Sequence, residues 1–556
     1  MNRSLVTLAL VVILWAGAPA EQNAASAPQN QPSLSRAELE AAARLSTKTI
    51  RDVTTDLASP EMEGRGTAQR GGHRAAAYLA KRFADLGLKP HGDDRTYLQE
   101  IPFRIERALP ESSFRAGDIT FKFREDFVVV DPFPAEPSDR SASLVFVGYA
   151  AASSVPNRDD FAGVDVKGKI VVVLDGKPRG VDEKLWDKFN SPLMVFTRLL
   201  NRRALAVVST YTASESERAQ YAMRRPFSVA ASYAVRRQVS PAAKPPLPPG
   251  FPPSILISPD AAERLFEGCG ISYAEAKRKA EAGEFVSRDL GKQASLSVRF
   301  SREQGTASNV VGVVEGSDAE LKNQAVVYTA HYDAYGIDSD GTIFPGAADN
   351  ALGVGKLVAT AEVFARMRPK PRRSILFIAL TAEEYGLLGS LHWLQRPTWP
   401  LPKVAADINY DGIGTDVWSK MTEITDVGFG HSDLGAVIAS VAAANNIAIL
   451  PDAAPEEQSL YRTDAYSFWR MGVPALSLKA QERGVQAARR REWEFKDYHM
   501  PTDTVRSDWE WDGARMLTIL GLITGMRIAN REAMPVWHPF SPYNRPRGSS
   551  ALPDPR

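Results

Sequence analysis

The chain has 556 residues, of which 44% are hydrophobic and 24% charged, the composition of a globular protein with more than one core. The formal net charge of +1 provides no argument for binding nucleic acid or an anionic membrane surface. The only cysteine, Cys269, excludes an intramolecular disulfide and a zinc–thiolate cluster.

The N-terminus has the pattern of a secretion signal. Arg3 precedes an apolar run at 5–15, and small residues at 18–20 form a cleavage site. Because the apolar run is short for a membrane-spanning helix, we expect cleavage after Ala20 and no stable membrane anchor. The expected location is the periplasm or the outside of the cell. Residues 21–37 are polar and rich in Ala, Gln, Ser and Pro, which predicts a disordered leader.

The segment 38–139 begins the globular part. Apolar side chains recur with helical spacing between residues 70 and 86, and Gly87 and Pro90 follow, so the pattern predicts an amphipathic helix there. The Gly-rich loop 63–72 before it lacks the lysine and hydroxyl pattern of a phosphate-binding loop. We therefore expect no nucleotide site.

The segment 140–300 is a different region. Its apolar runs are short and β-like, and these predicted strands hold neither histidine nor clustered carboxylates. We expect a separate, smaller β-rich domain inserted into the first, with a lid or substrate-gating role.

From 301 to 532 predicted strands and helices alternate. This alternation predicts an α/β fold with a largely parallel sheet flanked by helices on both faces, in three layers, completed by 38–139. The clearest strands are at 326–329, 375–380 and 404–408. The Pro-rich tail, 533–556, is expected to pack loosely on the surface or to be disordered.

Five side chains of the nitrogen and oxygen type that suits zinc lie at predicted strand ends, at a helix start or in an acidic loop. They are His331, Asp349, Glu384, Asp411 and His499. Open parallel sheets bind ligands at the carboxyl ends of their strands. A catalytic zinc usually takes three protein ligands, so five ligands fit two zinc ions if one carboxylate bridges them. The sequence therefore predicts a two-zinc hydrolase site.

Two neighbouring acids have expected roles in this site. Glu383 directly precedes a ligand and is the predicted general base, because a metal-bound water has a pKa near ~7 and can give its proton to a carboxylate. Asp333 lies two positions after His331, where its carboxylate can accept the other ring N–H of that histidine.

These pieces resemble the signature blocks of the co-catalytic dizinc aminopeptidase family, which has glutamate carboxypeptidase and glutaminyl cyclase among its relatives. The blocks are HYD (331–333), PGAADNALG (345–353), TAEEYGLLGS (381–390), NYDGIG (409–414) and YHMPTDT (498–504). FVGYAAA (146–152) and VDVKGKIVVVLDG (164–176) resemble the protease-associated (PA) domain often inserted in that family. The resemblance extends from about residue 45 to 530.

The resemblance implies a pairing of the ligands. One zinc would be bound by His331 and Asp411, the other by Glu384 and His499, and both by Asp349 as the bridge. Glu383 would be the base and Asp333 the residue that orients His331.

The resemblance also implies two finer features. Tyr498 is similar to the tyrosine that stabilises the oxyanion in some members, and a cis peptide bond is expected between Asp349 and Asn350. One departure is at Thr463 and Ala465, where relatives often have Ser and His. Those positions do not bind metal, so the departure concerns the substrate pocket.

The implied function is that of an exported dinuclear zinc exopeptidase, an aminopeptidase that removes N-terminal residues from peptides. Alternatives are a carboxypeptidase of the same family and a one-zinc acyltransferase like glutaminyl cyclase. A binding module that has lost its metals is disfavoured, because all five ligands and the base are present. Peptides are the expected partners, and no oligomeric state follows from the sequence.

Overall fold

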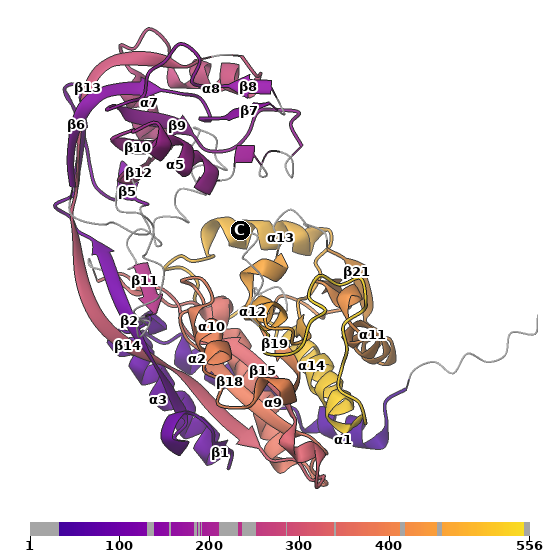
Figure 1. The fold of residues 1–556 in the computed structure, drawn as a ribbon. Coiled ribbons are helices and arrows are strands. Elements are labelled where there is room, and N and C mark those ends of the chain that lie inside the picture. The colour runs from indigo at the N-terminus through magenta and orange to yellow at the C-terminus, as the bar shows by residue number, and fades with distance from the viewer. Residues whose placement is uncertain are drawn as a thin grey trace, which may run out of the picture.

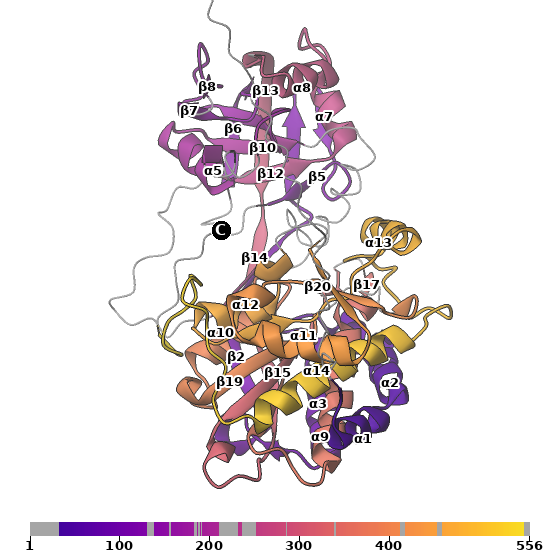
Figure 2. The same cartoon turned by 90° about the vertical axis from the view of Figure 1, so that its right-hand side faces the viewer.

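The computed structural model describes residues 33–130, 138–154, 157–182, 186, 189–190, 192–210, 232–235, 252–284, 286–338, 341–411, 417–452 and 459–549. The predicted signal segment, 1–20, lies outside the described residues, as does most of the predicted leader. Two eight-stranded sheets form two lobes, and long strands join them along one side (Figures 1 and 2).

The first sheet has the strand order β11-β2-β14-β18-β15-β19-β22, and β1 pairs with β14 beside this path. Its strands are β1 (Lys89–Pro90), β2 (Leu98–Ala108), β11 (Ser232–Val235), β14 (Phe300–Val314), β15 (Ala325–His331), β18 (Ser374–Leu380), β19 (Val404–Asn409) and β22 (Ala475–Ser477). Neighbours from β18 to β22 are parallel, whereas β14, β2, β11 and β1 pair antiparallel. The predicted α/β fold is confirmed, with the parallel arrangement confined to one half of the sheet.

Helices cover both faces of this sheet because its central strands are apolar on both faces. The helices are α1 (Arg36–Arg44), α2 (Thr47–Leu57), α3 (Arg70–Asp85), α9 (Leu352–Arg366), α10 (Leu388–Gln395), α11 (Leu434–Ala444), α12 (Asp464–Arg470), α13 (Val485–Lys496) and α14 (Asp512–Asn530). In β15, Val326 and Tyr328 join the core formed with α2, α9 and α14, while Val327 joins the core formed with α10 and α12. Successive side chains of a strand point to opposite faces, so one strand supplies both cores.

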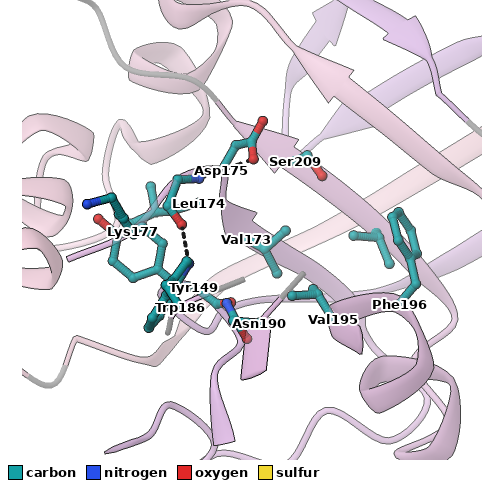
Figure 3. Close-up of a pocket in the computed structure, with 12 residues that line it drawn as sticks. Tyr149, Val173, Leu174, Asp175, Lys177, Trp186, Asn190, Val195, Phe196 and Ser209 are labelled. Atoms are coloured by element: carbon teal, nitrogen blue, oxygen red, sulfur yellow. Dashed lines mark hydrogen bonds between the residues drawn. The ribbon is translucent and has the colours of Figure 1, made fainter. Parts of the chain in front are cut away.

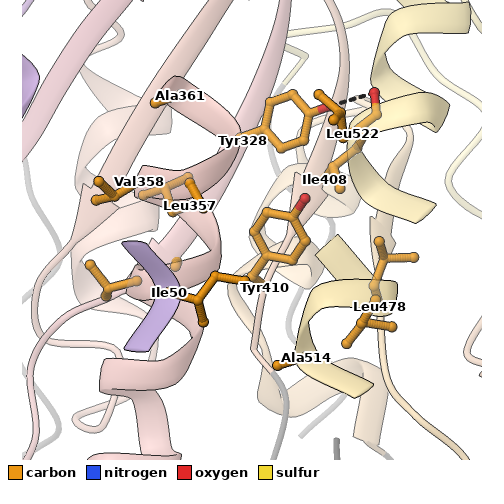
Figure 4. Packing of buried hydrophobic residues seen from close by; sticks show 14 of the residues in the cluster. Ile50, Tyr328, Leu357, Val358, Ala361, Ile408, Tyr410, Leu478, Ala514 and Leu522 are labelled. Atoms are coloured by element: carbon orange, nitrogen blue, oxygen red, sulfur yellow. Dashed lines mark hydrogen bonds between the residues drawn. The ribbon is translucent and has the colours of Figure 1, made fainter. Parts of the chain in front are cut away.

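Close packing fixes α14 against the sheet (Figure 4). The Tyr328 hydroxyl donates to the carbonyl oxygen of Gly521 at 2.9 Å. A Cβ atom at Gly525 would lie 1.8 Å from that hydroxyl, so only glycine permits this approach. Helix α14 is therefore a central core element.

Regular structure and core packing extend into the described parts of the predicted leader and tail. Helix α1 begins at Arg36 behind a capping box at Ser35, so two residues of the predicted leader are helical. In the predicted tail, Trp537 and Tyr543 are 7% and 6% exposed and their rings pack against Trp469. The expectation of a loosely packed tail is wrong over these residues, because its aromatic side chains complete the core beside α12; residues 550–556 lie outside the described part.

The second sheet has the order β4-β3-β13-β6-β9-β10-β12-β5. Its strands are β3 (Ser113–Ala116), β4 (Ile119–Phe121), β5 (Phe127–Val129), β6 (Ser138–Phe146), β9 (Ile170–Leu174), β10 (Ala206–Thr210), β12 (Ser254–Ile257) and β13 (Arg288–Val298). Helices α5 (Pro192–Asn201), α7 (Pro259–Phe266) and α8 (Tyr273–Glu281) belong to the same lobe (Figure 1). The sheet begins before the expected boundary at residue 140, because β3 pairs with β13 and β5 pairs with β12.

Three short two-stranded sheets complete the description of these residues. They are β7 (Ala152–Ser154) with β8 (Asn157–Asp159), β16 (Gly336–Ile337) with β17 (Ile343–Phe344), and β20 (Glu423–Asp426) with β21 (Ala448–Pro451). An ion pair joins the two lobes: Arg124, between β4 and β5, contacts Asp338, after β16, at 3.0 Å, and both side chains are largely buried. The hairpin β16–β17 is therefore tied to the second sheet.

A cavity of about 320 Å³ lies at the carboxyl ends of β9 and β10 in the second sheet (Figure 3). Tyr149, Trp186 and Phe196 supply its aromatic walls, and Asp175 and Ser209 supply polar groups. None of the predicted metal ligands lines it. Within the described residues, no helix has the length and apolarity needed to cross a membrane.

Candidate metal centre

The five predicted ligands converge at the carboxyl edge of the parallel half of the first sheet. His331 ends β15, Glu384 follows β18 and Asp411 follows β19. Asp349 lies in a short turn directly before α9, and His499 follows α13. Because β18, β15 and β19 are parallel neighbours, their ends meet at one edge, where side chains from distant parts of the chain come together.

Asp349 contacts two histidines, one with each carboxylate oxygen. Its Oδ1 lies 3.3 Å from His331 Nε2, and its Oδ2 lies 3.1 Å from His499 Nε2. Asp411 Oδ1 is 3.6 Å from the same nitrogen of His331, and Glu384 Oε2 is 3.2 Å from the same nitrogen of His499. The geometry therefore divides the ligands into two sets that share Asp349, the division that the family resemblance implies.

Glu383, the expected base, lies on the His331 side of this cluster. Its Oε2 is 3.9 Å from His331 Nε2. Ligand atoms of His331, Glu383 and Asp411 lie within 4.8 Å of one another, and so do those of His331, Asp349 and Glu384. Distance alone does not separate base from ligand here, so the role of Glu383 rests on the sequence pattern.

The residues present fit a divalent cation. His331 is 1% exposed and Asp349 is 7% exposed. Glu384 Oε1 is buried and accepts no hydrogen bond from any residue that the structure describes. Burying several carboxylates together costs free energy unless a cation compensates them. Imidazole nitrogens with carboxylate oxygens are a donor set that zinc accepts.

The electrostatics of the cluster follow from burial and shared protons. Burial raises the pKa of the Glu383 carboxyl well above its usual value, against the opposing charge of His331. Burial disfavours a charged His331, yet the surrounding carboxylates hold its pKa well above the usual value. Burial would raise the pKa of Asp349, but hydrogen bonds from both histidines outweigh it and lower this pKa below its usual range. A bound cation would displace the shared protons, since metal ligands bind deprotonated.

Asp333 contacts the site differently from the expectation. His331 Nδ1 lies 3.2 Å from the main-chain carbonyl oxygen of Asp333 and 3.7 Å from its Oδ1, so the carbonyl, not the carboxylate, is within hydrogen-bonding distance. The carboxylate instead accepts from the main-chain N–H of Glu383 at 3.2 Å and from the Thr67 hydroxyl at 3.4 Å. Asp333 thus positions the segment that carries the expected base.

Two buried charged residues that the sequence analysis did not single out hold the turn around Asp349. Asp503 accepts from the main-chain N–H groups of Ala348 and Asp349 at 3.1–3.2 Å. Arg65 donates at 2.5–2.7 Å to four carbonyl oxygens, those of Leu57, Tyr332, Pro345 and Gly346. The only sequence signals were a charged residue inside the Gly-rich loop and the first acidic residue after His499, and neither pattern reveals a partner far along the chain.

The peptide bond between Asp349 and Asn350 is cis, so that prediction is confirmed. Asn350 Nδ2 donates to the carbonyl oxygen of Tyr410 at 2.9 Å, and Asn350 Oδ1 accepts from the N–H of Gly353 at 3.0 Å. These bonds tie the start of α9 to the residue that precedes Asp411.

Tyr498 lies beside the cluster, with its ring against that of His499 at a centroid distance of 3.6 Å. Its hydroxyl oxygen accepts a hydrogen bond from Arg462 Nη2 at 2.8 Å. Burial raises the pKa of Tyr498 well above its usual value, so the phenol keeps its proton at neutral pH. A protonated phenol whose oxygen is already engaged by a guanidinium can donate to another acceptor.

Comparison with known proteins finds similarity over part of this chain. Residues 309–523 match Peptidase family M28. Aminopeptidase YwaD of Bacillus subtilis is 32% identical over 148 residues, 26% of this chain and 30% of that protein. The probable glutamate carboxypeptidase of Arthroderma benhamiae is 30% identical over 107 residues, 18% of this chain and 13% of that protein. The chain thus covers less than a third of the length of these curated relatives.

Two solved structures share the fold over most of both chains. The aminopeptidase from Aneurinibacillus sp. strain AM-1 has a TM-score of 0.58 at 17% identity and covers 90% of this chain and 98% of its own. BSAP, a zinc aminopeptidase from Bacillus subtilis, has a TM-score of 0.55 at 17% identity and covers 88% of this chain and 97% of its own. At this identity the likeness shows the fold alone. Residues 309–523 are thus similar to Peptidase family M28, in agreement with the resemblance of the motifs to the co-catalytic zinc aminopeptidase family.

Proposed function

We propose that the protein is an exported dinuclear zinc exopeptidase, an aminopeptidase that removes N-terminal residues from peptides. The observation that carries the proposal is Asp349, whose two carboxylate oxygens face two different histidines in a buried acidic cluster. Similarity to the family and the zinc aminopeptidase with the same fold support zinc as the metal.

The residues of the cluster would have different roles in hydrolysis. One zinc would be held by His331 and Asp411, the other by Glu384 and His499, and both by Asp349. When bound, zinc supplies a Lewis acid and lowers the pKa of a water molecule. Glu383 would take the proton of that water as it attacks the peptide carbonyl carbon, and would give a proton to the leaving amine nitrogen as the C–N bond breaks. Tyr498, held by Arg462, would donate to the carbonyl oxygen as negative charge develops on it.

The alternatives differ in metal count and in substrate. A one-zinc acyltransferase would not need both His331 and Asp411, which lie 3.6 Å apart in this cluster. A carboxypeptidase of the same family would use the same ligands, and one of the aligned relatives is a probable glutamate carboxypeptidase. The aligned Bacillus subtilis protein and both structural relatives are aminopeptidases, which favours that activity.

We propose further that the second sheet is an inserted PA-like domain that gates the site. The ion pair between Arg124 and Asp338 supports this role, because Asp338 lies just five residues after Asp333. Helix α13, which leads into His499, lies on the side of the lower lobe that faces the second sheet (Figures 1 and 2). Export is proposed from the signal pattern before Ala20, and peptides are the proposed partners, without nucleic acid or a stable membrane anchor.

The experiment is a panel of substrates offered to the zinc-loaded protein. Aminoacyl p-nitroanilides and free dipeptides should be cleaved, whereas dipeptides blocked at the N-terminus should not. Glu383→Gln, purified in parallel, controls for contaminating peptidases. Cleavage of the N-blocked peptides alone would instead identify a carboxypeptidase, and cyclisation of N-terminal glutamine without peptide cleavage would identify a cyclase.

A further inference from the structure

We propose that Tyr335 is a positioning residue of this metal centre: its hydroxyl links Glu384 to His499 and determines which nitrogen of His499 faces the metal. The inference rests on the proposed dinuclear site. Tyr335 lies four residues after His331, beyond the end of β15, and is 3% exposed. The sequence analysis assigned it no role.

The hydroxyl of Tyr335 lies between two predicted ligands of the same zinc ion. Its oxygen is 2.7 Å from Glu384 Oε2, to which it donates, and 3.3 Å from His499 Nδ1. An ionised carboxylate can only accept a hydrogen bond, so the hydroxyl of Tyr335 is the donor in this contact.

The count of protons then assigns the histidine tautomer. A phenol has one proton, and here it goes to the carboxylate. Toward His499 the phenol oxygen can only accept, so the imidazole proton lies on Nδ1. The other nitrogen, Nε2, keeps its lone pair and faces Asp349 Oδ2 at 3.1 Å and Glu384 Oε2 at 3.2 Å. Nε2 is therefore the atom presented to a cation shared with those carboxylates.

The same contact distinguishes the two oxygens of Glu384. Oε2 accepts the hydrogen bond from Tyr335, whereas Oε1 is buried and accepts none from the described residues. A carboxylate oxygen has two lone-pair sites, so Oε2 can accept from Tyr335 and still face the cation beside His499 Nε2. Tyr335 therefore orients both ligands with one hydroxyl group.

Ring packing holds that hydroxyl in place. The Tyr335 ring meets His499 edge-on at a centroid distance of 4.8 Å, and meets Phe344 and Tyr385 edge-on at 6.4 and 6.0 Å. The His499 ring also packs against the ring of Tyr498. With the imidazole held by two tyrosine rings, removal of the Tyr335 hydroxyl alone should leave the packing intact.

The test is Tyr335→Phe, which removes only the hydroxyl. Tyr332→Phe is the matched control, since Tyr332 is a buried tyrosine of the same segment whose hydroxyl donates to the carbonyl oxygen of Ser308 at 2.7 Å. Stepwise zinc dissociation constants are measured by competition with a chelator. Partners of metal-bound histidines typically contribute 10–100-fold to metal affinity. We expect Tyr335→Phe to weaken the binding of one of the two zinc ions by about that factor. Tyr332→Phe should leave both dissociation constants unchanged.

Three results would overturn the inference: unchanged zinc affinity in Tyr335→Phe, equal weakening of both ions, or an equal loss in the control. A second readout needs no variant of Tyr335. In the zinc-loaded protein labelled with ¹⁵N-histidine, His499 should carry its proton on Nδ1; a proton on Nε2 would overturn the inference even if Tyr335→Phe did not fold. Wild-type protein that binds fewer than two zinc ions would contradict the proposed function instead, so the two failures are distinguishable.

Discussion

Both sheets contain neighbouring parallel strands with side chains gathered at their carboxyl ends, but the two sets of side chains differ in charge and in hydrogen bonding. In the first sheet, the ends of β15, β18 and β19 bring together histidines and carboxylates, and Glu384 Oε1 accepts no hydrogen bond from the described residues. In the second sheet, the ends of β9 and β10 line the aromatic cavity of Figure 3.

Polar groups around that cavity bond to the protein itself. Trp186 Nε1 donates to the carbonyl oxygen of Gly176 at 3.0 Å, and Lys177 Nζ donates to that of Val181 at 2.9 Å. The ends of parallel strands therefore gather side chains in both lobes, but only the first of these two sites has a buried excess of carboxylates. Topology sets where a ligand can bind, and the residues placed there set the chemistry.

The largest expected effect is on metal binding at the first site. Asp349→Ala should remove both zinc ions, because Asp349 alone contacts both histidines. Asp175→Ala, at the end of β9, is the matched control and should retain two. Zinc content is measured by mass spectrometry of the purified variants. Two zinc ions in Asp349→Ala would contradict the bridging role.

The next effect separates catalysis from metal binding. Glu383→Gln should lower kcat by about 10²–10⁴-fold, the usual contribution of a general base, while zinc stays bound. Trp186→Phe, in the cavity of the second sheet, should leave kcat within about twofold of the wild-type value. Steady-state kinetics with zinc analysis on the same samples checks both, and near-normal turnover in Glu383→Gln would remove that residue from the mechanism.

The buried acids of the first lobe also predict a pH dependence. Burial raises the pKa of Asp464, the first residue of α12, to about 7, above a usual value of about 4. The folded state thus holds a proton that the unfolded chain releases, so stability falls as pH rises from about 4 to 7, by up to about 1.4 kcal/mol per pH unit. Asp464→Asn should flatten this slope in denaturant unfolding of the zinc-free protein. An identical slope in the variant would show that Asp464 does not titrate there.

The smallest effect concerns the contact between the lobes. Arg124→Gln should lower the free energy of unfolding by about 1.5–3 kcal/mol, the usual contribution of a hydrogen bond to a charged group, because the buried Asp338 carboxylate loses its contact with the guanidinium. Arg70→Gln breaks an ion pair in which the arginine is 71% exposed, and should cost at most about 1 kcal/mol. Equal costs in urea unfolding would mean that the contact between lobes is no stronger than a surface pair.

Local patterns in the sequence predicted much of the first lobe. The strands that lead to His331, Glu384 and Asp411 begin and end within two residues of their predicted bounds. These elements are apolar runs of regular period, and the ligands follow their ends, so both are visible without knowledge of distant contacts.

Features that depend on distant partners were not predicted. Strands β3 and β5 pair with β13 and β12, more than 120 residues away, which no local pattern reveals. Arg65 bonds to carbonyl groups from three parts of the chain, and Trp537 fills a gap beside Trp469. In each case the partner comes close only in the folded chain, so the local sequence around the residue does not predict the contact.

Anomalous diffraction at the zinc edge from crystals of the wild-type protein tests the central claim most directly. Two zinc ions bridged by Asp349 should give two peaks, about 3.5–4 Å apart as in other two-metal hydrolases, one near each carboxylate oxygen of Asp349. A single peak, or two peaks that do not share Asp349, would contradict it.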